Sequence, residues 1–307
     1  MSGPARRLLL VLVATVVLPA AASAPQADPT PLLTYAAAQN FPPRGAATTA
    51  AEYKSELERI SFSLKRDPPP ETDCARTLGA RRFATLYDEL GDVYSNIGDN
   101  SRAAEAYSRA IDCNPRAGFL HAQRAAALLD LGKYSEARAE TERELTLGHG
   151  SFALHNLITQ LDFVDHRWPD ARTHAELAAL EAPDDEQATY WQCFLWLAQM
   201  HAGVAMPSLA DRRGSTGWPA PILLHLEGVI TESDLVTDVS AERKEARRRE
   251  ILTEALYYTG QRHLASKQSD VALRYFEAAV RLQVTYFIEH HLAVAELDTL
   301  RRRAPQG

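Results

Sequence analysis

Apolar residues recur along much of this chain at spacings of three and four, the period of an α-helix that packs on one face. Tyr53, Leu57, Ile60 and Leu64 form one such stripe, which predicts a helix over residues 48–66. No segment keeps the alternation of apolar and polar residues that a half-buried strand requires. The pattern therefore predicts an all-α protein without a sheet.

A longer period lies over the helical one. Gly98 and Gly132 are 34 residues apart, and Ala103 and Ala137 repeat at the same interval. A fixed period of 34 is typical of the tetratricopeptide repeat (TPR), an antiparallel helix pair that stacks into a solenoid. We therefore predict a tetratricopeptide-repeat α-solenoid, with three TPR units over residues 77–185 and one more after a short helical insertion.

The first unit, residues 84–117, fills every position of the repeat signature. Gly91 and Ala103 stand where the two helices cross, because only small residues allow close approach there. Gly98 suits the left-handed turn that ends the first helix. The residues expected to be structural signature positions are Tyr87, Leu90, Gly91, Tyr94, Ala103, Tyr107, Ala110, Pro115, Gly132, Ala137, Ala171, Pro183, Gly260, Ala272, Phe276 and Ala279.

The remaining segments differ in composition. Residues 25–47 are rich in proline and alanine and predict an extended tether before the helix at 48–66. Residues 186–250 predict a helical insertion, in which Trp218 opens a short apolar helix. Residues 251–303 predict the last TPR-like unit and a final helix.

The first 24 residues have the pattern of a secretory signal peptide. Arg6 and Arg7 form a basic region, Leu8–Leu18 is apolar but too short to span a bilayer, and Ala22–Ala24 offers a cleavage site. An uncleaved anchor is the alternative. Removing residues 1–24 changes the formal charge from −7 to −9. We therefore expect an exported, mildly acidic protein that does not bind nucleic acid or anionic membranes.

Three cysteines occur, which in an oxidising compartment allows one disulfide and one free thiol. Cys74 precedes a predicted helix and Cys113 ends one, so these two are the candidate pair. Cys193 lies in an apolar helix and is expected to be a small buried residue. No CxxC pair occurs, which argues against redox catalysis and against a zinc site of the usual spacing.

The sequence contains no HExxH, P-loop, GxGxxG or GxSxG motif. His290 and His291 are neighbours on a helix and point about 100° apart, so they cannot easily share a metal ion and we expect one packed and one solvated. His121 and His155 recur at the 34-residue period and are expected to pack. We therefore expect no enzyme, no cofactor and no metal.

Several segments resemble the family of the bacterial lipoprotein NlpI. Tyr87–Gly91, Trp218–Val229, Phe287–His290 and Ala293–Leu297 carry the resemblance, which extends over residues 57–300. It implies an all-helical homodimer in the periplasm. It also implies an adaptor that holds peptidoglycan hydrolases, notably an NlpC/P60-type endopeptidase, and presents them to a Prc-type tail-specific protease.

One feature departs from this family. Its members carry a lipidated cysteine directly after the apolar region of the signal peptide, whereas the first cysteine here is Cys74. We therefore expect a soluble periplasmic form rather than a lipid anchor in the outer membrane.

By the phase of the repeat, the first helix of each unit faces the concave side. The residues expected to bind a partner there are Asp88, Asp92, Asn96, Asp130, Asn156, Gln160 and Phe163. An acidic and apolar groove favours a basic or amphipathic segment as the partner. The alternative is that Asp88 and Asp92 are merely solvated.

Two further expectations concern assembly. The helix at 48–66 is the expected dimer contact, because its apolar stripe needs burial. An assembly scaffold for another envelope complex, such as a pilus, is the alternative to the adaptor function.

Overall fold

The computed structural model describes residues 30–39, 41, 53–70, 73–148, 150–204 and 217–303. Within these ranges every regular element is a helix, as the sequence predicted. None of the described helices combines the length and the apolar composition needed to cross a bilayer. The predicted signal peptide, residues 1–24, lies outside the described residues.

Consecutive helices pack side by side in pairs. The repeat helices are α4 (Ala80–Asn96), α5 (Asn100–Cys113), α6 (Gly118–Asp130), α7 (Tyr134–Thr146), α8 (Phe152–Val164), α9 (Trp168–Glu181), α13 (Glu245–Ala265) and α14 (Ser269–Arg281). The other elements are α1 (Pro31–Ala38), α3 (Lys54–Arg66), the 3-10 turn η1 (Cys74–Arg76), α10 (Asp185–Ala202), α11 (Ala220–Leu226), α12 (Glu232–Ala241) and α15 (Ile288–Arg303).

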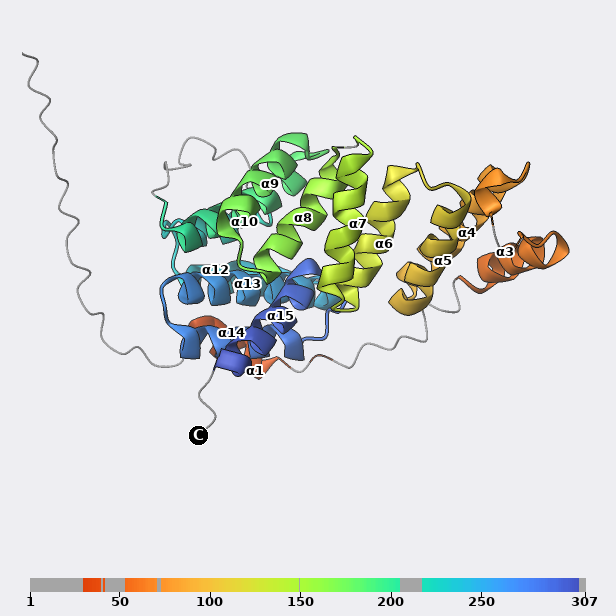
Figure 1. Cartoon of the computed structure of the whole chain (residues 1–307). Coiled ribbons are helices and arrows are strands. Elements are labelled where there is room, and N and C mark those ends of the chain that lie inside the picture. Colours follow the sequence, from red (N-terminus) through yellow and green to blue (C-terminus); the bar gives the residue numbers. More distant parts are fainter. Residues whose placement is uncertain are drawn as a thin grey trace, which may run out of the picture.

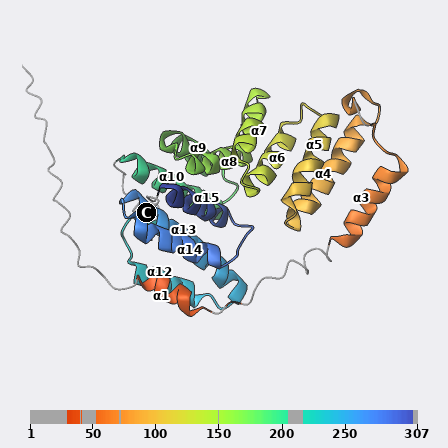
Figure 2. The ribbon, with the colours of Figure 1, turned by 60° about the horizontal axis from the view of Figure 1, so that its bottom comes forward.

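The helices follow a curve that is closed at one end. Figure 1 shows α3 to α10 succeeding one another along the curve, with α12 to α15 beneath its later part. The last helix, α15, packs on α13 and α14 and also reaches α8 of the third repeat. It therefore lies on the inner side of the curve, where Figure 2 also shows it.

Two signature glycines lie at close helix crossings, as predicted. A Cβ atom on Gly91 would stand 2.4 Å from Cε1 of Tyr107, and one on Gly260 would stand 2.7 Å from Cε1 of Phe276. Each ring lies 16 residues after its glycine. The first and last repeats therefore share one packing geometry, in which an aromatic ring takes the place of the missing side chain.

The turn within each repeat holds one left-handed residue at an equivalent position. Gly98 has a φ of 78°, as predicted, and Gly132 has a φ of 71°. The third and last repeats place His166 at 56° and Lys267 at 63° in this position. Side chains are disfavoured in this conformation, so these two turns are strained relative to the first two.

The prediction of an extended tether over residues 25–47 is wrong for the part that the structure describes. Residues 31–38 form α1, whose Leu32 and Leu33 are buried against the C-terminal helices. The Leu32 amide donates to Oε1 of Glu232 at 2.8 Å, and the Tyr275 hydroxyl donates to the same oxygen at 2.7 Å. Figure 2 shows α1 beside α12.

The apolar stripe predicted over residues 48–66 is partly buried within the chain itself. The helix begins at Lys54, and residues 48–52 lie outside the described residues. Ile60 is fully buried and packs with Leu86 and Val93 of α4. Tyr53, Leu57 and Leu64 pack against this cluster but stay partly exposed, so the dimer contact stays a prediction.

A disulfide joins Cys74 and Cys113, the candidate pair, with their Cα atoms 4.6 Å apart. It ties η1 to the end of α5. Cys193 is fully buried in α10, as expected of a small apolar residue, and burial raises the pKa of its thiol.

Candidate functional site

Two adjoining cavities lie along α8 and the start of α15 on the inner side of the curve. The first, of about 320 Å³, has an apolar wall of Ala122, Ala126, Ala153 and Leu157, and we call it the apolar cavity. The second, of about 310 Å³, lies between α8, α10, α13 and the start of α15, and we call it the aromatic cavity.

Asn156 and Ile288 line both cavities, so the two cavities adjoin each other. We call the pair of cavities the inner groove. Ile288, the first residue of α15, stands between the two cavities, and the last helix therefore shapes both of them.

Three of the predicted partner-binding residues line the apolar cavity, namely Asp130, Asn156 and Gln160. Asp130 already has partners, because the Asn100 amide donates to its Oδ2 at 3.2 Å and Nε2 of His291 lies 3.4 Å from its Oδ1. Burial raises the pKa of Asp130, and His291 opposes that rise. The Gln160 amide donates to Oδ1 of Asn156.

Asp88 and Asp92 lie next to the apolar cavity. Both contact Gln123, which lines that cavity. Oδ1 of Asp92 accepts from the Tyr107 hydroxyl at 2.8 Å and from the Gln123 amide at 3.0 Å. Partial burial, together with the nearby charge of Asp92, raises the pKa of Asp88 to about 6. Asp88 is therefore partly buried, whereas Asp92 is exposed but hydrogen-bonded, and the role of the two in partner binding stays a prediction. Asn96 is exposed at the end of α4 and lines neither cavity.

The prediction that Phe163 faces a partner is wrong. Phe163 is 1% exposed and lies in the C-terminal core. Its ring packs edge-on against Trp168 and Phe194, with centroids 5.3 Å and 5.2 Å away. The repeat phase points this position inward, but α9 and α10 cover it.

The aromatic cavity contains two buried carboxyl groups that the sequence analysis missed. Glu254 of α13 is 1% exposed and Glu289 of α15 is 5% exposed. The Tyr190 hydroxyl donates to Oε2 of Glu254 at 2.7 Å, and the Trp218 indole N–H donates to the same oxygen. Nη1 of Arg247 lies 3.9 Å from the other oxygen of Glu254.

Glu289 has fewer partners than Glu254. The Tyr258 hydroxyl donates to its Oε1 at 3.1 Å. Among the described residues no ion pair involves Glu289. Burial raises the pKa of both carboxyls, and the charge of Glu289 raises the pKa of Glu254 further. Acidic residues outnumber basic residues among the side chains that line the aromatic cavity.

The histidines singled out in the sequence are buried or partly buried. His290 is buried, which lowers its pKa to about 4, with His291 adding to the effect. His291 is partly exposed, and its Nε2 lies 3.4 Å from Oδ1 of Asp130, so the more accessible of the two histidines also has a partner. His121 and His155 are buried, as predicted. Within the described residues no group of three or more His, Cys, Asp or Glu side chains is arranged to hold a metal ion.

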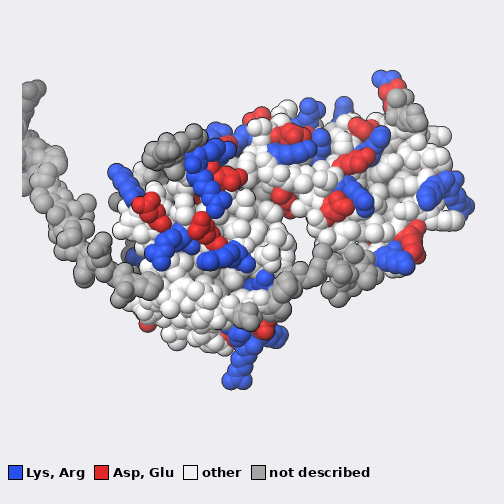
Figure 3. All heavy atoms as spheres, turned by 90° about the horizontal axis from the view of Figure 1, so that it is seen from below, with Lys and Arg blue, Asp and Glu red and all other residues white. Residues whose placement is uncertain are grey.

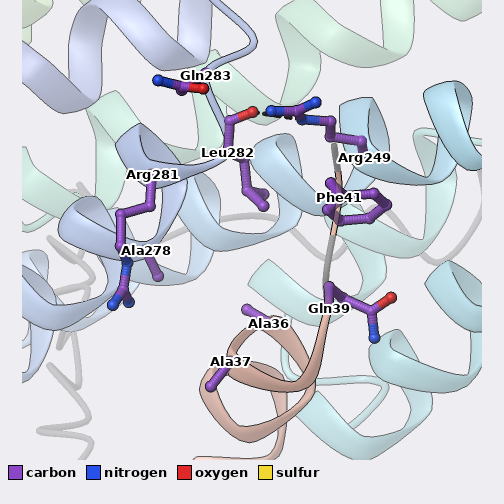
Figure 4. Close-up of a pocket in the computed structure, with 9 residues that line it drawn as sticks. All are labelled: Ala36, Ala37, Gln39, Phe41, Arg249, Ala278, Arg281, Leu282 and Gln283. Atoms are coloured by element: carbon purple, nitrogen blue, oxygen red, sulfur yellow. Dashed lines mark hydrogen bonds between the residues drawn. The ribbon is translucent and has the colours of Figure 1, made fainter. Parts of the chain in front are cut away.

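A third cavity, of about 320 Å³, lies between α1 and the end of α14 (Figure 4). Nε of Arg249 donates to the Leu282 carbonyl, and the guanidinium lies 5.6 Å from the ring centroid of Phe41. Figure 4 shows Arg281 directed away from Arg249. Residues of α1 and of α14 line opposite parts of this cavity, and we assign no ligand to it.

The charged side chains form no single-signed patch on the face that Figure 3 shows. Acidic and basic residues are scattered over both ends of the molecule, and much of the surface between them is uncharged. This distribution differs from the basic stripe of a nucleic-acid-binding protein.

These features define an α-solenoid of the tetratricopeptide type with a groove on its inner side. No protein-family model matches the chain, and no curated protein matches its sequence. Among solved structures the chain is similar to YrrB, described as a TPR protein with an unusual peptide-binding site. The likeness covers 78% of this chain and 97% of that chain, at 13% identity and a TM-score of 0.40. The fold assignment rests on the repeat geometry, and the NlpI resemblance stays a prediction.

Proposed function

We propose that this chain is a non-catalytic scaffold that binds a segment of another protein in the inner groove. The observation that carries the proposal is the pair of adjoining cavities, which open on the inner side of a curved helical stack. Stacked helix pairs create extended concave surfaces of the kind that bind polypeptides. The apolar wall around Ala126 and the polar side chains of Gln123 and Asn156 offer contacts to both side chains and backbone.

We further propose a periplasmic adaptor that holds a peptidoglycan hydrolase of the NlpC/P60 type and presents it to a Prc-type tail-specific protease. The NlpI resemblance supports this role, and the signal-peptide pattern supports export. The disulfide between Cys74 and Cys113 supports an oxidising compartment. Such an adaptor needs no chemistry of its own, since holding two proteins together raises their effective concentration to about the millimolar range.

Affinity capture from a periplasmic extract tests the proposal. The wild-type protein should recover a peptidoglycan hydrolase and a tail-specific protease. Ala126→Arg places a long cation in the apolar cavity and should reduce the recovered hydrolase by about tenfold or more. Ala139→Arg makes the same change at an exposed position of α7 and should leave the recovery unchanged.

Two results would contradict the proposal. Recovery of pilus or other envelope components without any hydrolase or protease would favour an assembly scaffold instead. A purified protein that cleaves cell wall unaided would show that the chain is an enzyme.

A further inference from the structure

We propose that the aromatic cavity binds one basic side chain, a lysine or an arginine, of the segment that lies in the inner groove. The inference rests on the proposed function, because it names the chemistry that the groove recognises. It is carried by the walls of the cavity, its uncompensated buried carboxyl and its position beside the apolar cavity.

The walls of the aromatic cavity suit a cation. Tyr190 of α10 and Tyr286 and Phe287, just before α15, line the cavity with rings that are at least partly exposed. Trp191 and Phe194 stack on each other with centroids 5.0 Å apart and are almost fully buried, so they support the wall of the cavity from within the core. Aromatic faces attract ammonium and guanidinium groups, and they also pack well against the methylene stems of lysine and arginine.

The charges within the cavity are unbalanced. Glu186, Glu254 and Glu289 line it together with one basic residue, Arg247. Arg247 is shared, since its guanidinium lies within 4 Å of Glu186, Glu250 and Glu254. Glu254 also accepts hydrogen bonds from the tyrosine and the tryptophan described above, so these neighbours hold its side chain in place.

Glu289 is the group that lacks a countercharge. It is 95% buried, it accepts from one side-chain hydroxyl, and no described ion pair reaches it. A buried carboxylate without a cation is unfavourable, and its raised pKa has the same cause. A lysine or arginine entering the cavity from a partner would supply the missing positive charge.

The position of the aromatic cavity beside the apolar cavity predicts a simple sequence pattern in the bound segment. Asn156 and Ile288 line the aromatic cavity on one side and the apolar cavity on the other. A segment that passes over these two residues can place an apolar side chain in one cavity and a basic side chain in the next. The expected recognition element is therefore a basic residue close to an apolar one, in extended or helical form.

A panel of four peptides tests the inference. The probes are acetylated and amidated hexapeptides of sequence Ala-Leu-Ala-X-Ala-Leu, in which X is lysine, arginine, norleucine or glutamate, titrated by calorimetry. The lysine and arginine peptides should bind about tenfold tighter than the norleucine peptide, and the glutamate peptide should bind more weakly still. Because norleucine keeps the stem of lysine and removes its charge, this comparison needs no variant of the protein.

Two variants locate the charge preference. Glu289→Gln should bring the lysine and norleucine peptides to equal affinity. Glu144→Gln is the matched control, since Glu144 is another buried carboxyl but lies on α7 and lines neither cavity of the groove. This control should keep the preference for lysine.

The outcomes separate this inference from the proposed function. Equal affinities for lysine and norleucine on the wild-type protein, or no measurable binding by either, would overturn the inference. So would a lysine preference that persists in folded Glu289→Gln. If capture of the partner depends on Ala126 but not on Glu289, the inference alone fails. If capture depends on neither residue, the proposed use of the groove fails as well.

Discussion

Helices α3 to α7 and helices α8 to α15 contain the same repeat, but they bury their side chains in different ways. In the first region the apolar contacts divide into small separate clusters, one of which extends to Leu157 and Leu161 of α8. In the second region, one continuous cluster takes in α8 to α15 and also α1. Repeats that contact only their neighbours form a nearly one-dimensional stack. The helices added outside the stack, α1, α11, α12 and α15, turn its second half into a globular core.

The two regions also differ in their buried polar groups. The second region buries Glu254, Glu289, Glu296 and Arg249. Glu296 of α15 accepts from the Gln261 amide at 3.0 Å, and one of its oxygens lies 3.0 Å from Nε2 of His166. This network holds the last helix across the inner side of the third repeat. It therefore also fixes the position of the groove that α15 shapes.

The largest expected difference in stability between the two regions comes from replacing matched aromatic residues by alanine. Phe276 and Tyr107 occupy equivalent positions, each over a glycine of the facing helix. Phe276→Ala should destabilise the protein by about 3–5 kcal/mol, because it opens a cavity in a continuous core. Tyr107→Ala should cost about 2 kcal/mol, because the smaller clusters around it can relax.

Hydrogen exchange can separate the two effects. Phe276→Ala should accelerate exchange throughout α8 to α15, whereas Tyr107→Ala should accelerate it in α4 to α6 and leave α13 protected. If both variants accelerate exchange over the whole chain equally, the two regions form one cooperative unit and the comparison fails.

The next largest effect concerns the disulfide between Cys74 and Cys113. It closes a loop of 39 residues in the region that has no large core. Its loss in the variant Cys113→Ser should destabilise that region by about 3 kcal/mol, mainly because the unfolded chain gains freedom. Urea unfolding followed by hydrogen exchange should show α4 and α5 opening first, with α13 and α14 unchanged. Equal loss of protection in α13 would contradict the separation of the two regions.

The sequence predicted the parts of this structure that depend on local contacts. The requirement for a glycine at Gly91 arises from its own repeat, where the ring of Tyr107 approaches closely, and the same holds for Gly260 and Phe276. A single repeat contains both partners of such a contact. The signature of such a repeat can therefore be recognised from a single sequence.

The parts that depend on distant contacts could not be predicted in this way. The amide of Leu32 binds a carboxylate 200 residues away, so a proline- and alanine-rich segment that looks extended becomes a docked helix. Phe163 has the phase of an inner-face residue, but α10 covers it. Glu254 and Glu289 carry no periodic signal of burial. The aromatic cavity was therefore missed, although Asn156 at its edge was identified.

A smaller effect on stability is expected from one buried glutamate in the first region. Glu144 is 2% exposed, and its Oε2 accepts no hydrogen bond from the described residues. Burial raises the pKa of Glu144 to about 7, from an ordinary value of 4.5. A carboxyl whose folded pKa is raised gives stability that is complete below pH 4.5 and is lost as the pH rises through 7. Glu144→Gln should therefore stabilise the protein by about 1–2 kcal/mol at pH 8 and have little effect at pH 4.5.

The second region supplies the matched contrast. Glu296→Gln should destabilise the protein at pH 8, because the carboxylate of Glu296 has partners in Gln261 and His166. Urea unfolding of both variants at the two pH values measures the effect. A Glu144→Gln variant that gains the same stability at pH 4.5 and pH 8 would show that the charge of Glu144 is not the cause.

The smallest effect uses the left-handed turn that all four repeats share. Lys267 holds this conformation with a side chain, at a cost of roughly 1–2 kcal/mol, and glycine would remove that cost. Glycine also frees the unfolded chain, which offsets about 0.4–1 kcal/mol of the gain. Lys267→Gly should therefore raise the stability by about 0.5 kcal/mol, and Gly98→Ala should lower it by about the same amount or more. Thermal unfolding compares the two variants. A turn acts on its own repeat in either region. Changes in stability of equal size and opposite sign would therefore show that the two regions differ in their cores alone. A loss of stability in Lys267→Gly would show that the Lys267 side chain has a role that its backbone conformation does not reveal.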